Sequence, residues 1–343
     1  MKKNLKDYTL TELNELFKEW GEPSFRAKQV FEWVYRSISS VDEMINIPKS
    51  LREKLNETCS IGIVQIAQKL VSNIDGTRKY LLKLEDGNFI ESVLMKYQHG
   101  YTICISSQVG CHMGCAFCAS TKGGKVRDLT AGEIIGQVMT VQQDLGERIS
   151  NIVMMGIGEP LDNYENVLRF LENVTHPSGL NIGQRHISLS TCGIVPKIID
   201  LAERKLQITL SVSLHAATDE ARSAIMPLNR TYSIKQLMDA CDYYIQKTNR
   251  RISFEYTLIN EKNDSIADCD KLTALLKGKL CHVNLIPVNA VKENTFSKTP
   301  QKRVEQFRQR LEHAGIPATV RREMGADINA ACGQLRNSCT KDM

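Results

Sequence analysis

The feature that most restricts the fold of this chain is a regular alternation of short β-rich runs with helix-length amphipathic segments from Tyr101 onward. Six runs are clear and a seventh is a candidate; in order they read TICISS, NIVMMG, HISLS, ITLSVSL, ISFEYTL, CHVNLIP and ATVR. Strands that alternate with helices at this spacing predict βα units and a parallel sheet. We therefore expect an α/β fold whose core is a partial (β/α)6 barrel of the TIM type.

The residues before this core follow other patterns. Thr9 and Glu12 have the spacing of a helix capping box, and further periodic stretches indicate a small helical domain. The chain then changes to alternating strands, with Asp-Gly dipeptides at 75–76 and 86–87 that are typical of hairpins. We predict four parts: a helical accessory domain at 1–60, which is a candidate for RNA binding, a β-hairpin extension at 61–96, the barrel core at 97–331 and a C-terminal segment at 332–343.

The amino-acid composition indicates in which cellular compartment the protein works. The chain has 343 residues and eleven cysteines, an odd number without a secretory leader, which favours reduced thiols over a disulfide framework. No stretch approaches the roughly 18 apolar residues that a membrane helix needs. We expect a cytoplasmic protein without a membrane partner. The net charge of +5 is compatible with a polyanionic partner, and basic stretches at 122–127, 250–251 and 321–322 could contact phosphates or lie on solvated faces.

Polar and cysteine residues follow the predicted strands at the points where the strands end. In barrels and open parallel sheets, this edge carries the chemistry. The residues at these positions are Cys111, Cys115 and Cys118 after the first run, Gly158 and Glu159 after the second, Ser190 near the end of the third, Ser213, Leu214 and His215 after the fourth, and Asn289 after the sixth.

The three cysteines allow several interpretations. Their spacing also fits one face of a helix, where they would be buried thiols. Structural zinc takes four closed ligands, and the neighbouring sequence has no second cysteine pair, so zinc would need a distant ligand. A [4Fe–4S] cluster held by three thiolates would leave one iron open to a small molecule.

The spacing Cys-x3-Cys-x2-Cys, with Phe117 before the last cysteine, resembles the signature of the radical S-adenosylmethionine (SAM) superfamily. The resemblance implies one [4Fe–4S] cluster on Cys111, Cys115 and Cys118, with SAM at the open iron. It also implies that the segment GIGE contacts the SAM amino group. The remaining residues of the SAM pocket would be Gly158, Glu159, Ser190, Ser213, Leu214, His215 and Asn289.

Further motifs narrow the resemblance. SSQVGC, MGIGEPLDN, LSTCGIVP, SLHA, NLIPVN and DINAACGQL resemble the RlmN/Cfr family of RNA adenosine methyltransferases over nearly the whole chain. Pro160 stands where the C8-modifying branch has alanine. It favours the branch that methylates C2 of adenosine 2503 in 23S rRNA and of adenosine 37 in some tRNAs. The alternatives are C8 methylation of the same rRNA adenosine, or a noncatalytic RNA-binding protein with a metal at the three cysteines.

The resemblance also implies roles for three remote residues. Cys332 would accept a methyl group from one SAM, and a second SAM would supply the radical that activates this methyl for attack on adenine. Glu91 would accept the proton; its alternative is a cross-strand surface carboxylate. Cys104 would then form a transient disulfide with Cys332. The partners would be 23S rRNA, tRNA and an electron donor such as flavodoxin or ferredoxin, with the chain acting as a monomer. No role is assigned to Cys59, Cys192, Cys241, Cys269, Cys281 and Cys339.

Overall fold

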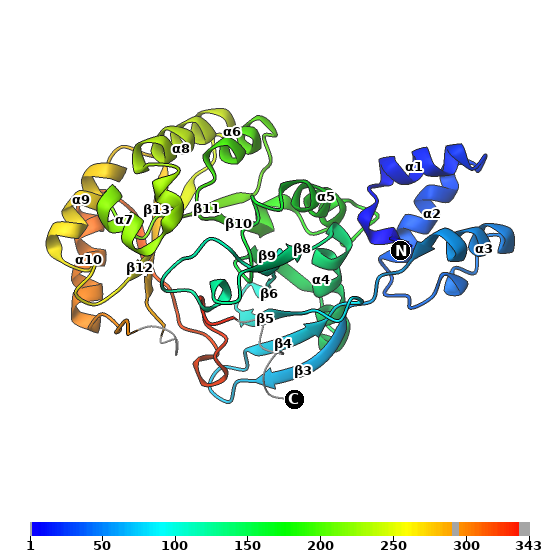
Figure 1. Ribbon diagram of the computed structural model, residues 1–343, viewed down its shortest axis with the longest axis horizontal. Helices are drawn as coiled ribbons and strands as arrows, with labels where there is room; N and C mark the ends of the chain where they lie inside the picture. Colours follow the sequence, from blue (N-terminus) through cyan, green and yellow to red (C-terminus); the bar gives the residue numbers. More distant parts are fainter. Residues whose placement is uncertain (1, 290–294, 336–343) are drawn as a thin grey trace.

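The computed structural model describes residues 2–289 and 295–335, and its centre is a ten-stranded sheet with the order β14-β13-β12-β11-β10-β9-β6-β5-β4-β3 (Figure 1). Seven neighbouring strands run parallel, and their bounds are Gly100–Cys104 (β6), Ile149–Met154 (β9), Ile187–Thr191 (β10), Thr209–Ser213 (β11), Ile252–Leu258 (β12), Cys281–Pro287 (β13) and Ala318–Val320 (β14). The predicted α/β barrel core is confirmed, and the candidate run ATVR forms its short seventh strand.

Helices connect these strands. Their bounds are Ala131–Leu145 (α4), Tyr164–Thr175 (α5), Val195–Glu203 (α6), Asp219–Ile225 (α7), Ile234–Thr248 (α8), Ile266–Leu276 (α9) and Gln301–His313 (α10). Capping boxes define where α4 and α8 begin, at Thr130 with Glu133 and at Ser233 with Gln236. The apolar faces of the helices pack on the strands in one continuous core. This packing fixes the strands relative to one another, and with them the edge of the sheet at which they end.

The N-terminal region forms the predicted helical domain, with three helices at Leu10–Glu19 (α1), Ser24–Val34 (α2) and Lys49–Thr58 (α3). The Thr9–Glu12 capping box is present, and the helices bury an apolar cluster of their own. Short strands Lys3–Asn4 (β1) and Cys59–Ser60 (β2) pair in parallel and bring the two ends of this region together. Asp7 accepts a hydrogen bond from the Gly132 amide at 2.7 Å, which fastens the region to the first turn of α4.

The predicted hairpin extension consists of Gln65–Val71 (β3), Arg78–Lys83 (β4) and Phe89–Tyr97 (β5). These strands are antiparallel, and β5 pairs with β6, so the extension continues the barrel sheet instead of standing apart from it. Both Asp-Gly turns occur where predicted, with Gly76 at φ +72° and Gly87 at φ +87°. The division of the chain at residues 60, 96 and 331 stays a prediction. Within the described ranges, no helix is long and apolar enough to cross a membrane.

Candidate active site

The three motif cysteines lie on a loop, not on a helix. The loop leaves β7 (Gln108–Gly110) and returns through β8 (Lys125–Asp128), and these two strands pair antiparallel at its base. Gly110 has φ +74°, and a Cβ at this position would lie 1.9 Å from the carbonyl oxygen of Gly124. The close approach of the two strands therefore requires glycine here. The alternative of three thiols on one helical face is wrong.

Cys111, Cys115 and Cys118 line one cavity at the carboxyl ends of the strands, which we call the cysteine cavity. Burial raises the pKa of Cys111 to about 12 and that of Cys118 to about 11, so the free thiols are protonated at neutral pH. Binding to a metal would displace these protons. Among residues 2–289 and 295–335, no three His, Cys, Asp or Glu side chains are already gathered around a metal position. The fit to a cluster therefore rests on donor chemistry and the shared cavity.

Glu159 also lines the cysteine cavity and is 1% exposed. Its carboxylate oxygens accept hydrogen bonds from the Leu161 amide at 2.9 Å and from the Cys192 amide at 2.7 Å. Burial raises the pKa of this carboxyl group. Gly158 precedes it at φ +105°, and a Cβ there would lie 2.6 Å from the Cβ of Gln108. The glycine thus lets the chain turn Glu159 into the cavity.

Four other predicted pocket residues also line the cysteine cavity: Ser190, Ser213, His215 and Asn289. Leu214 does not, because its side chain is fully buried in the apolar core, and its assignment to SAM binding stays a prediction. Burial lowers the pKa of His215 to about 3, so its ring is neutral. The ring nitrogen Nδ1 accepts a hydrogen bond from the Thr257 amide at 2.9 Å.

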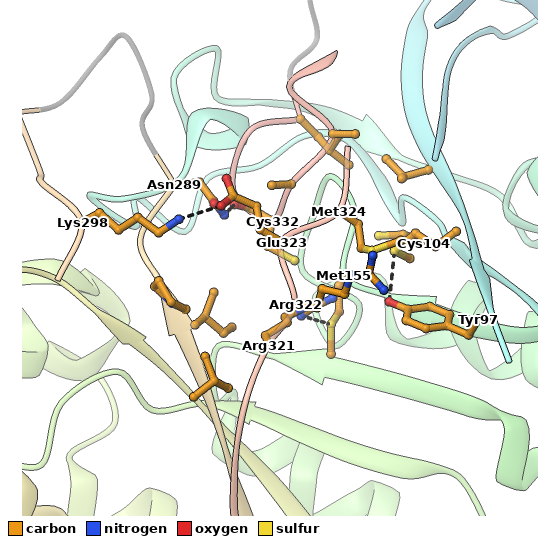
Figure 2. A pocket seen from close by; sticks show the side chains of 18 of the residues that line it. Tyr97, Cys104, Met155, Asn289, Lys298, Arg321, Arg322, Glu323, Met324 and Cys332 are labelled. Carbon is orange, nitrogen blue, oxygen red and sulfur yellow. Dashed lines mark hydrogen bonds and ion pairs between the residues drawn. The ribbon is translucent and has the colours of Figure 1, made fainter. Parts of the chain in front are cut away.

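A second cavity, which we call the C-terminal cavity, lies beside the first and contains both Cys104 and Cys332 in its lining (Figure 2). Five residues line both cavities and so form a common wall: Met155, Ile286, Asn289, Arg321 and Cys332. Asn289 holds this wall through a hydrogen bond from its Nδ2 to the Cys332 carbonyl oxygen at 3.0 Å. Cys332 therefore borders the cavity of the three cysteines on one side and the cavity of Cys104 on the other.

The two remote cysteines differ in environment. Cys104 ends β6 and is 6% exposed, and burial together with the nearby Cys332 raises its pKa to about 12. Cys332 is partly exposed, and both are free thiols. Arg321 is the cation of the common wall, and the nearby sulfur of Cys332 raises the pKa of its guanidinium. Figure 2 shows this arginine between Cys332 and Met155, to whose sulfur it donates a hydrogen bond at 3.3 Å.

Glu91 lies in β5 and is only 2% exposed, so the alternative of a surface carboxylate is wrong. Its Oε1 forms an ion pair with Lys79 Nζ at 2.9 Å, and Lys79 also donates to the Asn329 carbonyl oxygen at 3.2 Å. Glu91 lines neither cavity, but it lies two residues from Val93, which lines the C-terminal cavity. Because alternate residues of a strand share a face, both side chains point to the same side of the sheet.

The segment that carries Cys332 is fastened to the hairpin turn between β3 and β4. Asp75 accepts from the Gly325 amide at 3.0 Å, and Asp327 accepts from the Asn73 amide at 2.9 Å. Beyond Cys332, the Gly333 carbonyl accepts from the Ala119 amide at 2.8 Å, next to the last motif cysteine. Of the predicted C-terminal segment, 336–343 lie outside the described residues, as does Cys339.

Two neighbours of the site, Cys192 and Arg222, had no role assigned from the sequence. Cys192 follows β10 and lines the cysteine cavity, and its Sγ lies 4.0 Å from Cys115 Sγ. Arg222, in α7, is fully buried and donates to the Cys192 and Ser213 carbonyl oxygens at 2.7 and 2.9 Å. The position of Cys192 directly after a predicted strand was a usable signal; nothing in the sequence of α7 marks Arg222.

Two of the three basic residues in the stretch 122–127 form internal ion pairs. Lys125 pairs with Asp162 at 2.7 Å and Asp128 at 2.8 Å, and Arg127 pairs with two carboxylates at 2.7 Å each, those of Asp86 and Glu133. Both side chains help to fix the base of the loop that carries the three motif cysteines.

Comparison with known proteins agrees with this geometry. Residues 105–272 match the family model described as Radical SAM superfamily, and residues 3–61 match the one described as Ribosomal RNA large subunit methyltransferase N-terminal domain. A protein of Clostridium perfringens strain SM101, named probable dual-specificity RNA methyltransferase RlmN, is 58% identical over 99% of this chain and 98% of its own length. A protein of the same name from Clostridium beijerinckii is 58% identical over 98% of this chain and 95% of its own.

Among solved structures, a radical SAM methyltransferase from Sphaerobacter thermophilus superposes with a TM-score of 0.92 at 44% identity, covering 98% of this chain and 99% of that one. The fold and these matches define the class, the radical SAM superfamily, for which a [4Fe–4S] cluster and SAM are the cofactors. Within it, the chain belongs to the RlmN-type family of radical SAM methyltransferases. The expected family, fold and enzyme class are confirmed.

Proposed function

We propose that this protein methylates C2 of adenosine in RNA, at adenosine 2503 of 23S rRNA and adenosine 37 of some tRNAs, through a methyl-cysteine and a transient disulfide. One observation carries the proposal: Cys332 belongs to the common wall of two cavities. A residue in this position can receive a group on the side of the cysteine cavity and deliver it on the side of the C-terminal cavity. The names of the relatives support RNA as the substrate.

The residues of the cysteine cavity fit the cofactors of the superfamily. Cys111, Cys115 and Cys118 are soft sulfur donors of the kind that hold iron–sulfur clusters. Glu159 offers a buried carboxylate that suits the ammonium group of SAM, and Ser190, Ser213, His215 and Asn289 line the same space. Bound there, the cluster and SAM supply the radical chemistry of the superfamily. Two SAM molecules would be used in each turnover, one as methyl donor and one as radical source.

Such chemistry suits the target atom. C2 of adenine lies between two ring nitrogens and is poor in electrons, so it cannot displace the methyl group of SAM as a thiolate can. The thiolate of Cys332 can perform that displacement, which places the methyl group on its sulfur. Attack of the activated methyl carbon on C2 would then join enzyme and RNA covalently through Cys332.

Two other side chains would complete the reaction. Glu91 would take the C2 proton as a general base, and its Oε1 lies 2.9 Å from Lys79 Nζ. The Cys104 thiolate would attack the sulfur of Cys332, so that a disulfide forms while the carbon–sulfur bond to the RNA breaks and the released carbon takes up a proton to become the methyl group. Both cysteines line the C-terminal cavity, which supports this pairing. External reduction would return the two thiols.

The target base must leave its stack to reach the C-terminal cavity, at a cost of roughly a few kcal/mol that phosphate contacts would offset. We assign these contacts to the N-terminal helical domain. We further propose that an electron-transfer protein such as flavodoxin or ferredoxin reduces the cluster, and that the chain acts as a monomer in the cytoplasm.

The test supplies CD3-labelled SAM and RNA to anaerobically reconstituted enzyme and locates the label by mass spectrometry and NMR. We expect label at C2 of adenine. Label at C8 would move the chain to the C8-modifying branch. Zinc at the three cysteines, with no SAM cleavage and no methyladenine, would leave a noncatalytic RNA-binding protein.

Two single variants test whether Cys332 and Cys104 have the different roles proposed for them. We expect Cys104→Ala to stall with RNA bound covalently through Cys332, as a SAM-dependent and nuclease-sensitive band on a denaturing gel. Cys332→Ala should assemble its cluster and give no such band. If both variants lack the adduct, the two cysteines do not have the proposed roles.

A further inference from the structure

At the cysteine cavity, both backbone polar groups of Cys192, its amide and its carbonyl oxygen, form hydrogen bonds with side chains. Its amide donates to Glu159 Oε2 at 2.7 Å, and its carbonyl oxygen accepts from Arg222 Nη2 at 2.7 Å. These two short hydrogen bonds, both to charged side chains, fix the position of the residue at the end of β10. Its side chain lines the cysteine cavity, and its Sγ lies 4.0 Å from Cys115 Sγ.

Binding of iron by Cys115 would decide which of the two sulfurs is the hydrogen-bond donor and which is the acceptor. An iron-bound cysteine is a thiolate without a proton, so it can only accept a hydrogen bond. The proton shared in this contact must then belong to Cys192. The S–H group of Cys192 would therefore point at a ligand sulfur of the cluster.

We propose that Cys192 is a positioning residue that donates an S–H hydrogen bond to the cluster ligand Cys115 and thereby makes the cluster easier to reduce. This inference rests on the proposed function, in which Cys115 is an iron ligand. Hydrogen bonds to the sulfurs of iron–sulfur clusters are among the features that set their reduction potentials. Reduction adds negative charge that is shared with the ligand sulfurs, so a donor stabilises the reduced form more than the oxidised form.

The positive charge of Arg222 would also stabilise the reduced form of the cluster. Its guanidinium is fully buried, and the four hydrogen bonds that the described structure gives it all end on neutral oxygen atoms, those of Cys192, Ser213, Leu214 and the Asn229 side chain. Its positive charge is thus held directly behind Cys192. A fixed cation at this place favours any added electron in the adjacent cavity.

The test measures the midpoint reduction potential of the cluster in the reconstituted holoenzyme, by spectroscopic redox titration, for the native chain, Cys192→Ala and Cys192→Ser. We expect Cys192→Ala to shift the potential to a more negative value, so that a smaller fraction of its cluster is reduced at the native midpoint. Cys192→Ser keeps a donor and should lie between the two. Cys269→Ala is the matched control, because it removes a fully buried thiol that lines neither cavity and should leave the potential unchanged.

Iron and sulfide contents equal to those of the native enzyme show that each variant has assembled its cluster. An unchanged potential in a fully loaded Cys192→Ala enzyme would overturn the proposal while leaving the proposed function standing. Loss of iron from Cys192→Ala but not from Cys269→Ala would also overturn it, because Cys192 would then be an iron ligand and not a donor to one. A Cys115→Ala enzyme that keeps a full cluster would instead refute the ligand assignment on which both proposals depend.

Discussion

The buried guanidinium of Arg222 joins the ends of β10 and β11 to α7, and replacing it by methionine tests how much this joint stabilises the fold. The side chain donates four hydrogen bonds, to the carbonyl oxygens of Leu214, Cys192 and Ser213 and to Asn229 Oδ1, at 3.1, 2.7, 2.9 and 3.0 Å. Hydrogen bonds from a charged donor contribute about 1.5 kcal/mol each at the low end, or about 6 kcal/mol for four. In Arg222→Met, roughly half of this loss in stability is offset, because the variant does not have to bury a charged guanidinium away from water.

We therefore expect Arg222→Met to lower the free energy of unfolding by about 3 kcal/mol, which corresponds to a decrease in Tm on the order of 5 °C for a chain of this size. Urea unfolding followed by far-UV circular dichroism measures the change. Arg230→Met, at an exposed position of the 3-10 turn Pro227–Arg230, is the control and should unfold like the native protein. If Arg222→Met is as stable as the native chain, the four hydrogen bonds only offset the cost of burying the charge, and the reasoning fails.

Two further predictions concern buried ionisable side chains near the site. Lys79→Met should destabilise the fold by about 2 kcal/mol, because it removes the charged donor that pairs with the buried Glu91 carboxylate and bonds to the Asn329 carbonyl oxygen; Lys79→Arg and the exposed Lys96→Met should lose far less stability in the same urea assay. For His215, burial lowers the pKa to about 3, so the unfolded chain binds a proton more readily than the folded one and stability falls as the pH falls below about 6.5. The native protein should lose up to about 1.4 kcal/mol per pH unit more than His215→Gln between pH 6 and pH 4, and parallel pH profiles of the two would contradict this.

Much of the architecture could be predicted from local patterns. The alternation of β-rich and amphipathic runs identified the parallel strands, and the residues placed after them, apart from Leu214, line one cavity. The hairpin turns and the Thr9 capping box follow from chemistry within a few residues of the chain. Such features depend on local geometry, which a single sequence contains.

Features that depend on packing between distant segments could not be predicted in this way. The segment DEARSAI reads as a polar surface helix, yet Arg222 is fully buried because carbonyl oxygens at two strand ends accept its hydrogen bonds. The contact of Cys192 with Cys115 joins residues 77 positions apart. Glu91 has the alternation of a half-exposed strand, but it is buried and pairs with Lys79, whose Nζ also donates to the Asn329 carbonyl oxygen of the distant C-terminal segment.

The fastening of the Cys332 segment to the β3–β4 turn has a consequence for the order in which the protein can fold during synthesis. The hydrogen bonds between this segment and the β3–β4 hairpin join residues 250 and 254 positions apart, from Lys79 to Asn329, from Gly325 to Asp75 and from Asn73 to Asp327. Contacts of such long sequence separation carry a large loop-closure cost and form only after both partners have been made. The helical domain and the first strands of the barrel can thus pack before the Cys332 segment has been made, whereas the wall between the two cavities closes only afterwards. A nascent chain therefore lacks this wall until the segment that carries Cys332 has left the ribosome.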